Sequence, residues 1–253
     1  MKGKIAVAVL AGGALLSLAG VSVAQETPVR MLEITEIGVK IGHEMKFRVG
    51  VKAYLKCYGE KGGEGSWSTW RNVDGSGTSY HVVSSRSGWA ELGKVDAARE
   101  SCWPMIEEQV APHMESVSTR FARHMPDWSG TPGDDNTVVR LHQFRVEDGK
   151  KFREVVGAVT AVMKESKYPH LGSWYDVLGN SSNEADYFVV AYYKDFAAMD
   201  EDRQTAYEAV KASAGEQRAD ALWEDFGDSL TDDWDYFTML LHRDDELSRM
   251  TAP

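Results

Sequence analysis

Histidine is the residue type in this sequence best suited to acid–base or metal chemistry. Seven are present, namely His43, His81, His113, His124, His142, His170 and His242. No two of them have the i, i+4 spacing of a helical metal site, and none forms a His-x-His pair. The sequence also lacks a Gly-x-Ser-x-Gly elbow, a phosphate loop and a dinucleotide fingerprint. We therefore predict no metal centre, and no single motif identifies a catalytic residue.

Two tryptophans are candidates for the wall of a ligand cavity. Trp67 and Trp174 each follow a serine on a predicted strand. Thr69 and Asp176 lie two residues further on, and therefore on the same strand faces, where they could add polar groups. Ligand cavities are commonly apolar with few polar groups. The alternative is that both tryptophans are buried core anchors that bind nothing.

These candidates need elements to position them, and the elements come in two similar copies about 105 residues apart. Lys46-Phe47-Arg48 returns as Lys151-Phe152-Arg153, and Ser66-Trp67 returns as Ser173-Trp174. Repetition at this spacing indicates two copies of one small fold. We place the first copy at residues 25–130, a linker at 131–136 and the second copy at 137–253.

Each copy has the predicted order strand, helix, strand, strand, helix, strand. In the second copy the expected ranges are 138–146, 150–166, 173–178, 187–193, 196–227 and 234–242. In the first copy the expected ranges are a strand within 29–41, a helix that carries Phe47 and Tyr58, strands at 66–73 and 79–85, a helix at 101–111 and a strand at 117–125. This is the split βαβ plan of ferredoxin-like domains. Because such a sheet leaves one face bare, we predict an α+β fold of two ferredoxin-like βαββαβ repeats packed sheet to sheet as a pseudo-dimeric α+β barrel.

The repeat singles out three histidines on strands as candidate ligand contacts. His81 stands at the position that Phe188 fills in the other copy, so an ionisable residue replaces an apolar one. His142 and His242 lie on strands that are expected to be neighbours. If both face the interior, they could share one polar group of a ligand. The alternative for all three is a structural position without a binding role.

The first 24 residues have the pattern of an export signal. Lys2 and Lys4 precede an apolar run, and small residues lead up to Ala24, which predicts cleavage between Ala24 and Gln25. An uncleaved membrane anchor is the alternative. Cleavage would give a periplasmic or secreted protein that has no membrane contact once the leader is removed.

Export also determines how the two cysteines are interpreted. Thiols outside the cytosol tend to oxidise, so Cys57 and Cys102 are expected to form a disulfide. In the predicted fold the two helices that carry them are antiparallel neighbours, which brings the pair within reach of a bond. Two free, buried thiols are the alternative. The formal net charge is −11, and no cluster of lysine and arginine supplies the basic face that a nucleic-acid partner requires, so we predict no nucleic-acid partner.

The duplicated element order, with its paired Lys-Phe-Arg and Ser-Trp segments, resembles the dimeric α+β barrel superfamily in a tandem-fused, exported bacterial form. The resemblance covers about residues 29–245. It implies a fold, but the superfamily includes cofactor-free monooxygenases, haem-dependent enzymes, small isomerases and proteins without a known activity. Some members hold haem iron with a histidine near the end of the second helix, which implies His113 as the equivalent here.

The sequence leaves two functions of different class open. The first is a soluble binding protein that takes a small, mostly apolar ligand, or a partner, between its two sheets. The second is a cofactor-independent enzyme of the monooxygenase or isomerase type that acts on a small aromatic substrate. We expect no cofactor, with haem as the alternative, and a monomer or a weak dimer.

Overall fold

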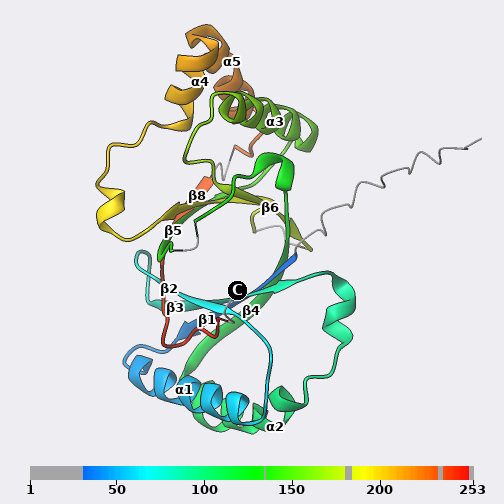
Figure 1. Ribbon diagram of the computed structural model, residues 1–253, viewed down its shortest axis with the longest axis vertical. Helices are drawn as coiled ribbons and strands as arrows, with labels where there is room; N and C mark the ends of the chain where they lie inside the picture. The colour runs from blue at the N-terminus through cyan, green and yellow to red at the C-terminus, as the bar shows by residue number, and fades with distance from the viewer. Residues whose placement is uncertain (1–30, 134, 180–183, 233–235, 251–253) are drawn as a thin grey trace, which may run out of the picture.

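The computed structural model describes residues 31–133, 135–179, 184–232 and 236–250. Within these residues, eight antiparallel strands form a closed barrel, and helices cover its outside at the top and the bottom (Figure 1). The first half of the chain supplies β1 (Met31–Val39), β2 (Ser68–Asn72), β3 (Thr78–Arg86) and β4 (Met114–His124). The second half supplies β5 (Val138–Phe144), β6 (Ser173–Leu178), β7 (Tyr187–Tyr193) and β8 (Tyr236–Arg243). The predicted export signal and its cleavage site lie outside the described residues.

The strand order corrects the fold predicted from the sequence. Two ferredoxin-like repeats packed as separate sheets, face to face, are not what the chain forms. The order is β1-β3-β2-β8-β5-β7-β6-β4, and the last strand pairs with the first. Strand β2 pairs with β8 through Trp70 and Arg243, and β4 pairs with β6 through Phe121 and Leu178. A closed barrel is favoured over two separate sheets, because each separate sheet would leave the backbone N–H and C=O groups of its edge strands without partners.

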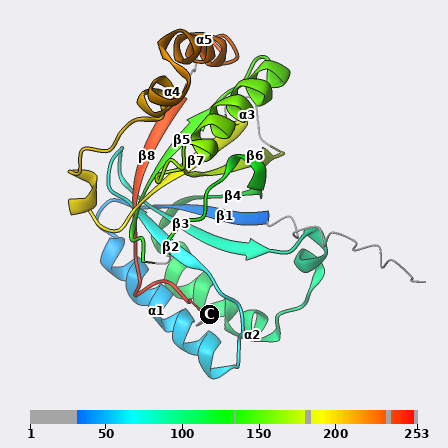
Figure 2. The same cartoon turned by 45° about the horizontal axis from the view of Figure 1, so that its top comes forward.

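Five α-helices of the described chain pack against the outside of the barrel. Helices α1 (Glu44–Glu60) and α2 (Ala97–Met105) cover the first half, and α3 (Gly149–Glu165), α4 (Ala206–Ala214) and α5 (Glu216–Gly227) cover the second half (Figure 2). Helix α3 begins at Gly149 because the Asp148 carboxylate accepts the backbone N–H groups of Lys150 and Lys151. Its buried face carries Phe152, Val156 and Met163 at helical spacing.

The later helix of each half differs from its predicted range. In the first half the helix starts four residues earlier than expected, because Asp96 caps it by accepting the backbone N–H of Arg99. Pro104 therefore lies inside α2, where it lacks a donor for the helical ladder, and a π-helical turn follows at Ile106–Val110. In the second half the expected helix is interrupted by Gly215, whose φ of 88° ends α4 before α5 begins.

Apolar side chains gather in three clusters. One lies between the second half of the barrel and α3, α4 and α5, and includes Phe144, Phe152 and Leu222. A second lies beneath α1 and includes Phe47 and Tyr80. The third fills the barrel interior from both halves, with members that include Ala122, Val139, Val177, Phe188, Val190 and Leu241. The face of a strand therefore decides whether its side chains meet the helices or the barrel interior.

A disulfide joins the two helices of the first half. Cys57 of α1 and Cys102 of α2 are bonded, with their Cα atoms 6.0 Å apart. Cys102 is fully buried. The predicted disulfide is confirmed, and it closes a loop of 45 residues in the chain.

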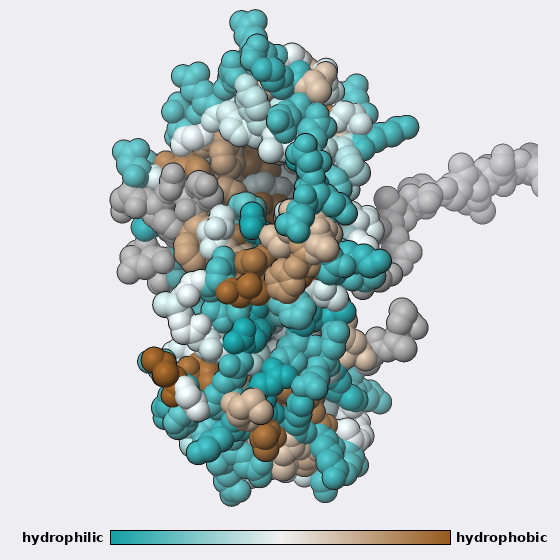
Figure 3. All heavy atoms as spheres, turned by 90° about the vertical axis from the view of Figure 1, so that its left-hand side faces the viewer, coloured by the Kyte–Doolittle hydropathy of each residue, from teal (hydrophilic) through white to brown (hydrophobic). Residues whose placement is uncertain are grey.

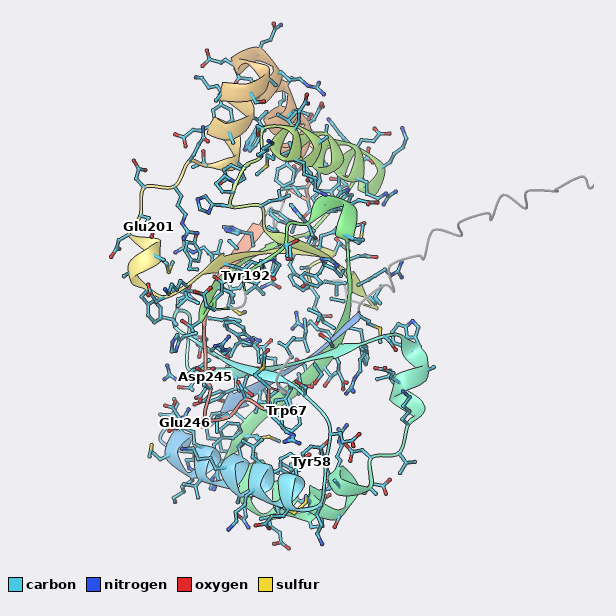
Figure 4. The ribbon with its side chains drawn as sticks, in the orientation of Figure 1. Tyr58, Trp67, Tyr192, Glu201, Asp245 and Glu246 are labelled. Atoms are coloured by element: carbon cyan, nitrogen blue, oxygen red, sulfur yellow. A yellow bond between two sulfur atoms is a disulfide. The ribbon has the colours of Figure 1, made fainter. Side chains whose placement is uncertain are left out.

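The chain after β8 returns to the first half. Leu247 is fully buried beside Phe47 and Tyr80, and Trp67 exchanges two backbone hydrogen bonds with Arg249. Arg48 of α1 forms an ion pair with Asp244 and a second with Glu246. Figure 4 shows Asp245 and Glu246 in this returning segment, and Figure 2 shows its red ribbon running from β8 towards α1. We call residues 244–249 the C-terminal clasp.

One glycine in helix α1 should lose stability when it is replaced by alanine, which is the opposite of the usual effect in a helix. Alanine normally stabilises a helix relative to glycine by about 0.5–1 kcal/mol. At Gly50, however, an added Cβ would overlap the backbone carbonyl of Gln109 and touch the Val110 side chain. We expect Gly50→Ala to lower the free energy of unfolding by about 1–3 kcal/mol. Gly59→Ala, in the same helix with nothing within 4 Å, is the control and should be neutral or stabilising in urea unfolding. A stabilised Gly50→Ala variant would contradict the close approach of the two segments.

Candidate functional site

The strongest candidate site is a pocket of about 260 Å³ on the outside of the barrel. It lies between the outer faces of β5, β6 and β7 and the helices α3, α4 and α5; we call it the helix–barrel pocket. The strands contribute Phe144, Trp174, Val189 and Ala191, and the helices contribute Val156, Val159, Thr160, Met163, Ala206, Trp223 and Phe226. Apolar surface gathers in the upper half of one face of the molecule, below the topmost helices (Figure 3). An apolar pocket with few polar groups is the usual form of a small-molecule site.

Polar groups are confined to a few places in this pocket. Tyr168, His170 and Leu171 form part of its wall where the chain turns from α3 into β6. The Tyr168 hydroxyl donates a hydrogen bond to the carbonyl oxygen of Gln204, at 2.6 Å, and so ties this turn to the segment that precedes α4. Burial and the positive charge of Arg203 lower the pKa of His170. Its imidazole is therefore mainly neutral at pH 7 and can accept or donate one hydrogen bond.

Trp174 lies in the wall of the helix–barrel pocket. Its ring stacks on Phe144, with ring centroids 5.5 Å apart, and meets Trp128 edge-on at 6.0 Å. Asp176, on the same strand face, lies near Arg123 and Arg153. Burial raises the pKa of Asp176, although the two arginines oppose this shift. The structure thus places Trp174 on the helix side of the sheet rather than in a cavity between sheets, and its role in binding stays a prediction.

Trp67 occupies the equivalent side of the first half but lines no part of this pocket. Its indole N–H donates to the carbonyl oxygen of Leu247 at 3.3 Å, and its ring meets Tyr58 edge-on at 5.5 Å. Figure 4 shows Trp67 and Tyr58 between the barrel and the helices of the lower half. Thr69 is buried and also donates to Leu247. Both residues hold the C-terminal clasp in place.

His142 and His242 do not come together in the barrel interior. His142 shares its strand face with Phe144, which packs against α3, and so faces outwards. His242 pairs in register with Arg71 and is exposed, with its ring stacked on Phe196 at 5.2 Å. His142 pairs with Thr238, four residues from His242 along β8. That offset corresponds to about 13 Å at ~3.3 Å per residue, so the two cannot hold one polar group.

His81 faces the barrel interior, as does its counterpart Phe188. It lies opposite Glu36 in the β1–β3 register and is only 5% exposed. Arg120 forms an ion pair with Glu36 at 3.2 Å, and the Ser79 hydroxyl lies 3.4 Å from His81 Nε2. Burial lowers the pKa of His81; the charge of Glu36 opposes this shift and that of Arg120 adds to it. A neutral histidine is therefore held among charged neighbours near the apolar interior.

This environment predicts a dependence of stability on pH. In the unfolded chain His81 takes up a proton near its ordinary pKa of 6.5, whereas in the folded protein it resists protonation. The unfolded state therefore binds more protons as the pH falls below about 6.5, and the free energy of unfolding should decrease there. His81→Phe should make the decrease between pH 7.5 and pH 5.5 shallower in urea unfolding. An unchanged slope would show that His81 does not contribute to the pH dependence. The dependence would then come from other groups such as His142 and His170, whose pKa values are also lowered.

The surroundings of His113, the residue suggested for haem, do not fit that cofactor. His113 Nδ1 lies 3.0 Å from His43 Nδ1, beside an open groove of about 420 Å³ between α1 and the turn at Ile106–Val110. Haem needs a slot that encloses both faces of a flat macrocycle, which an open groove does not supply. The helix–barrel pocket is more enclosed, but its volume falls below the roughly 300–1,000 Å³ of pockets for drug-sized ligands. We therefore derive no chemistry through haem.

Metal-ligating side chains do not gather in the part of the chain that the structure describes. No cluster of three or more histidine, cysteine, aspartate or glutamate side chains is arranged to hold a metal ion there. Among the same residues, no helix has the length and apolar character needed to cross a bilayer.

Most of the helix–barrel pocket has no counterpart in the sequence predictions. The spacing of apolar residues in α3 predicts a core face, but Val159 and Met163 of that face border a cavity. The Tyr168-Pro169-His170 segment predicts only the end of a helix. Arg203 has no sequence signal that distinguishes it from other surface arginines.

Comparison with solved structures identifies the class of fold. A proposed monooxygenase from Lactobacillus acidophilus is similar with a TM-score of 0.52 and 12% identity, over 85% of this chain and 94% of that one. A proposed monooxygenase from Fusobacterium nucleatum is similar with a TM-score of 0.51 and 12% identity, over 85% and 92%. A chlorite dismutase variant from Candidatus Nitrospira defluvii, in complex with cyanide, gives a TM-score of 0.50 and 9% identity, over 88% and 93%. No protein-family model and no curated protein sequence matches the chain.

The chain thus has the fold of the dimeric α+β barrel proteins. Both halves of the barrel come from one polypeptide, as the tandem resemblance implied. At such low identity the likeness concerns the fold, and function has to be argued from the site.

Proposed function

We propose that this protein binds a small, mostly apolar molecule in the helix–barrel pocket. The observation that carries the proposal is the lining: aromatic and aliphatic side chains surround a volume of about 260 Å³, and the polar groups are few. The pocket is partly open, so its aromatic walls are in contact with water when it is empty. An apolar ligand that covers these walls removes apolar surface from water, which is favourable. The pocket lies outside the barrel, so the ligand is not held between two sheets.

Tryptophan fluorescence offers a direct test, because Trp174 and Trp223 both line the pocket. We take 2-naphthamide as a neutral aromatic probe and expect saturable quenching with a dissociation constant of about 10–100 µM. Ala191→Phe should weaken binding by about tenfold or more, because the new ring occupies the cavity. Ala212→Phe, on the exposed side of α4, is the matched control and should bind as the natural protein does. Equal binding by both variants would locate the probe elsewhere and refute the proposal.

A second function is catalysis on a small aromatic substrate in the same pocket. Two similar structures are proposed monooxygenases, and here a mainly neutral His170 in the pocket wall could accept a proton from a bound phenol. Oxygen uptake with a naphthalenediol, above the uncatalysed rate and lost in Ala191→Phe, would support this function. Binding without uptake would leave the protein as a carrier or sensor.

We also propose that the protein works outside the cytosol as a monomer or a weak dimer. The disulfide supports export, because such bonds persist in oxidising compartments. The closed barrel supports a monomer, because the two strand pairs that join its halves, β2 with β8 and β4 with β6, form within one chain. Protein isolated from the periplasm or the medium should have the mass of a chain that starts at Gln25. Native mass spectrometry should give the mass of a monomer or a weakly associated dimer. A cytosolic full-length chain would contradict it.

A further inference from the structure

One buried donor near the helix–barrel pocket has no hydrogen-bond partner among the described residues. The Nε of Arg203 is buried and makes no hydrogen bond with any residue that the structure describes. The rest of the guanidinium is held in place: it lies over the Tyr193 ring, 4.4 Å from the centroid, and Nη1 donates to the carbonyl oxygen of Tyr192 at 3.1 Å. Buried N–H groups are nearly always paired in native proteins. A fixed cation with an unused, buried N–H is therefore a candidate for ligand recognition.

Arg203 is not among the residues that line the pocket, but it lies close to several that do. It precedes α4 by three residues, and Ala206, the first residue of α4, lines the pocket. Ala191, two residues before Tyr193 on the same strand face, lines it as well. The charge of Arg203 acts on both Tyr168 and His170 in the pocket wall. These neighbours place the positive charge beside the polar part of an otherwise apolar lining.

The acidic residue that contacts this cation leaves it available. Glu201 lies 3.4 Å from Nη2 of Arg203, and 62% of the Glu201 side chain is exposed to solvent. Figure 4 shows Glu201 on the segment that projects from the side of the molecule, whereas Tyr192 lies at the barrel. Because the Glu201 side chain is exposed, water screens its charge and this ion pair is weak, although the Arg203 side chain is only 21% exposed. Among the described residues that line the pocket there is no aspartate or glutamate, although the charges of Glu201 and Glu208 act on His170 and Tyr168 from outside the lining.

We propose that the ligand is a small aromatic or branched apolar acid, whose carboxylate binds Arg203 beside the helix–barrel pocket. The apolar body would lie among the aromatic side chains, and a carboxylate oxygen would accept the free N–H of Arg203. The neutral His170 can donate a second hydrogen bond. This inference rests on the proposed binding function and names the chemical class of the ligand.

The test compares two probes of nearly the same shape, 2-naphthoate and neutral 2-naphthamide, by the quenching of tryptophan fluorescence. We expect the carboxylate to bind about tenfold more tightly than the amide, because hydrogen bonds to a charged group are the stronger ones. Arg203→Met keeps the apolar length but removes the charge. It should weaken 2-naphthoate about tenfold or more and leave 2-naphthamide within about twofold. Arg218→Met, an exposed arginine on α5, is the control and should change neither.

The outcomes separate the two proposals. If neither probe binds the natural protein, the binding function itself falls, and this inference falls with it. If the amide binds as tightly as the carboxylate, the pocket exists but the proposed recognition of an acid is wrong. The comparison needs only the natural protein, so the inference can be refuted even if Arg203→Met does not fold. An equal loss of both probes in a folded Arg203→Met variant would also overturn it, because it would indicate a structural role.

Discussion

Replacing Cys57 and Cys102 together by alanine should lower the free energy of unfolding by about 4 kcal/mol. The bond closes a loop of 45 residues, and the chain-entropy relation gives about this value for a loop of that length. For a chain of this size each kcal/mol shifts the melting temperature by about 2–4 °C, so a fall of roughly 10 °C is expected. Thermal unfolding followed by circular dichroism measures it.

The natural protein in excess reductant is the control for this loss. It should unfold at the same temperature as the double variant, because both lack the bond but share the same packing elsewhere. The single variant Cys57→Ala should match them closely. A fall below about 1 kcal/mol would mean that the unfolded chain gains little freedom when the bond is absent.

The second large effect is expected in the apolar cluster between the second half of the barrel and helices α3, α4 and α5. Phe152 is fully buried, and its ring stacks on Tyr187 at 4.8 Å and packs against Phe226 at 5.7 Å. Phe152→Ala should lower the free energy of unfolding by about 3–5 kcal/mol, because it removes buried apolar surface and leaves a cavity. Urea unfolding of the variant gives this value.

The repeat supplies a matched comparison for Phe152. Phe47 holds the equivalent place under α1 and is 1% exposed, so Phe47→Ala should have a similar cost. Phe237 is 49% exposed, and Phe237→Ala should cost about 0.5 kcal/mol, as surface substitutions do. If all three variants lost the same stability, the aromatic clusters would not be the source of the effect.

Local patterns in the sequence are sufficient to locate most strands. The predicted ranges 173–178 and 187–193 coincide with β6 and β7. Both segments are dense in aromatic and β-branched residues and are bounded by turn-forming residues, which is a strong strand signal. The opening strand of the first copy is harder to define, but β1 at Met31–Val39 falls within the expected 29–41. The Lys-Phe-Arg repeats also contain two buried phenylalanines, Phe47 and Phe152.

Closure of the barrel does not follow from the same patterns. It depends on the pairing of Trp70 with Arg243 and of Phe121 with Leu178, across long separations in the chain. Alternation along a strand shows which residues share a face, but it does not show which other strand lies beside an edge. Two open sheets and one closed barrel therefore have the same local signature.

The candidate site is predictable only in part, for a related reason. The sequence indicates Trp174 as a possible cavity wall, but the cavity is formed against α3 and α5 rather than against another sheet. His142 and His242 do lie on neighbouring strands. Their surroundings, however, depend on which face of the sheet packs against the helices, and the sequence does not show this. Arg203 gains its unusual setting from Tyr192 and Tyr193, and this contact arises only when the chain folds.

The C-terminal clasp has a consequence for how the polypeptide tolerates being cut. Its contacts with Arg48 and Trp67 cross from one half to the other, in addition to the two hydrogen-bonded seams. A single break in the segment between β4 and β5 would leave two fragments. They would still be joined by the β2–β8 pair, the β4–β6 pair and the C-terminal clasp. Such a nicked particle should migrate as one species under native conditions, and the fragments made separately should reassemble like the two chains of a natural heterodimer.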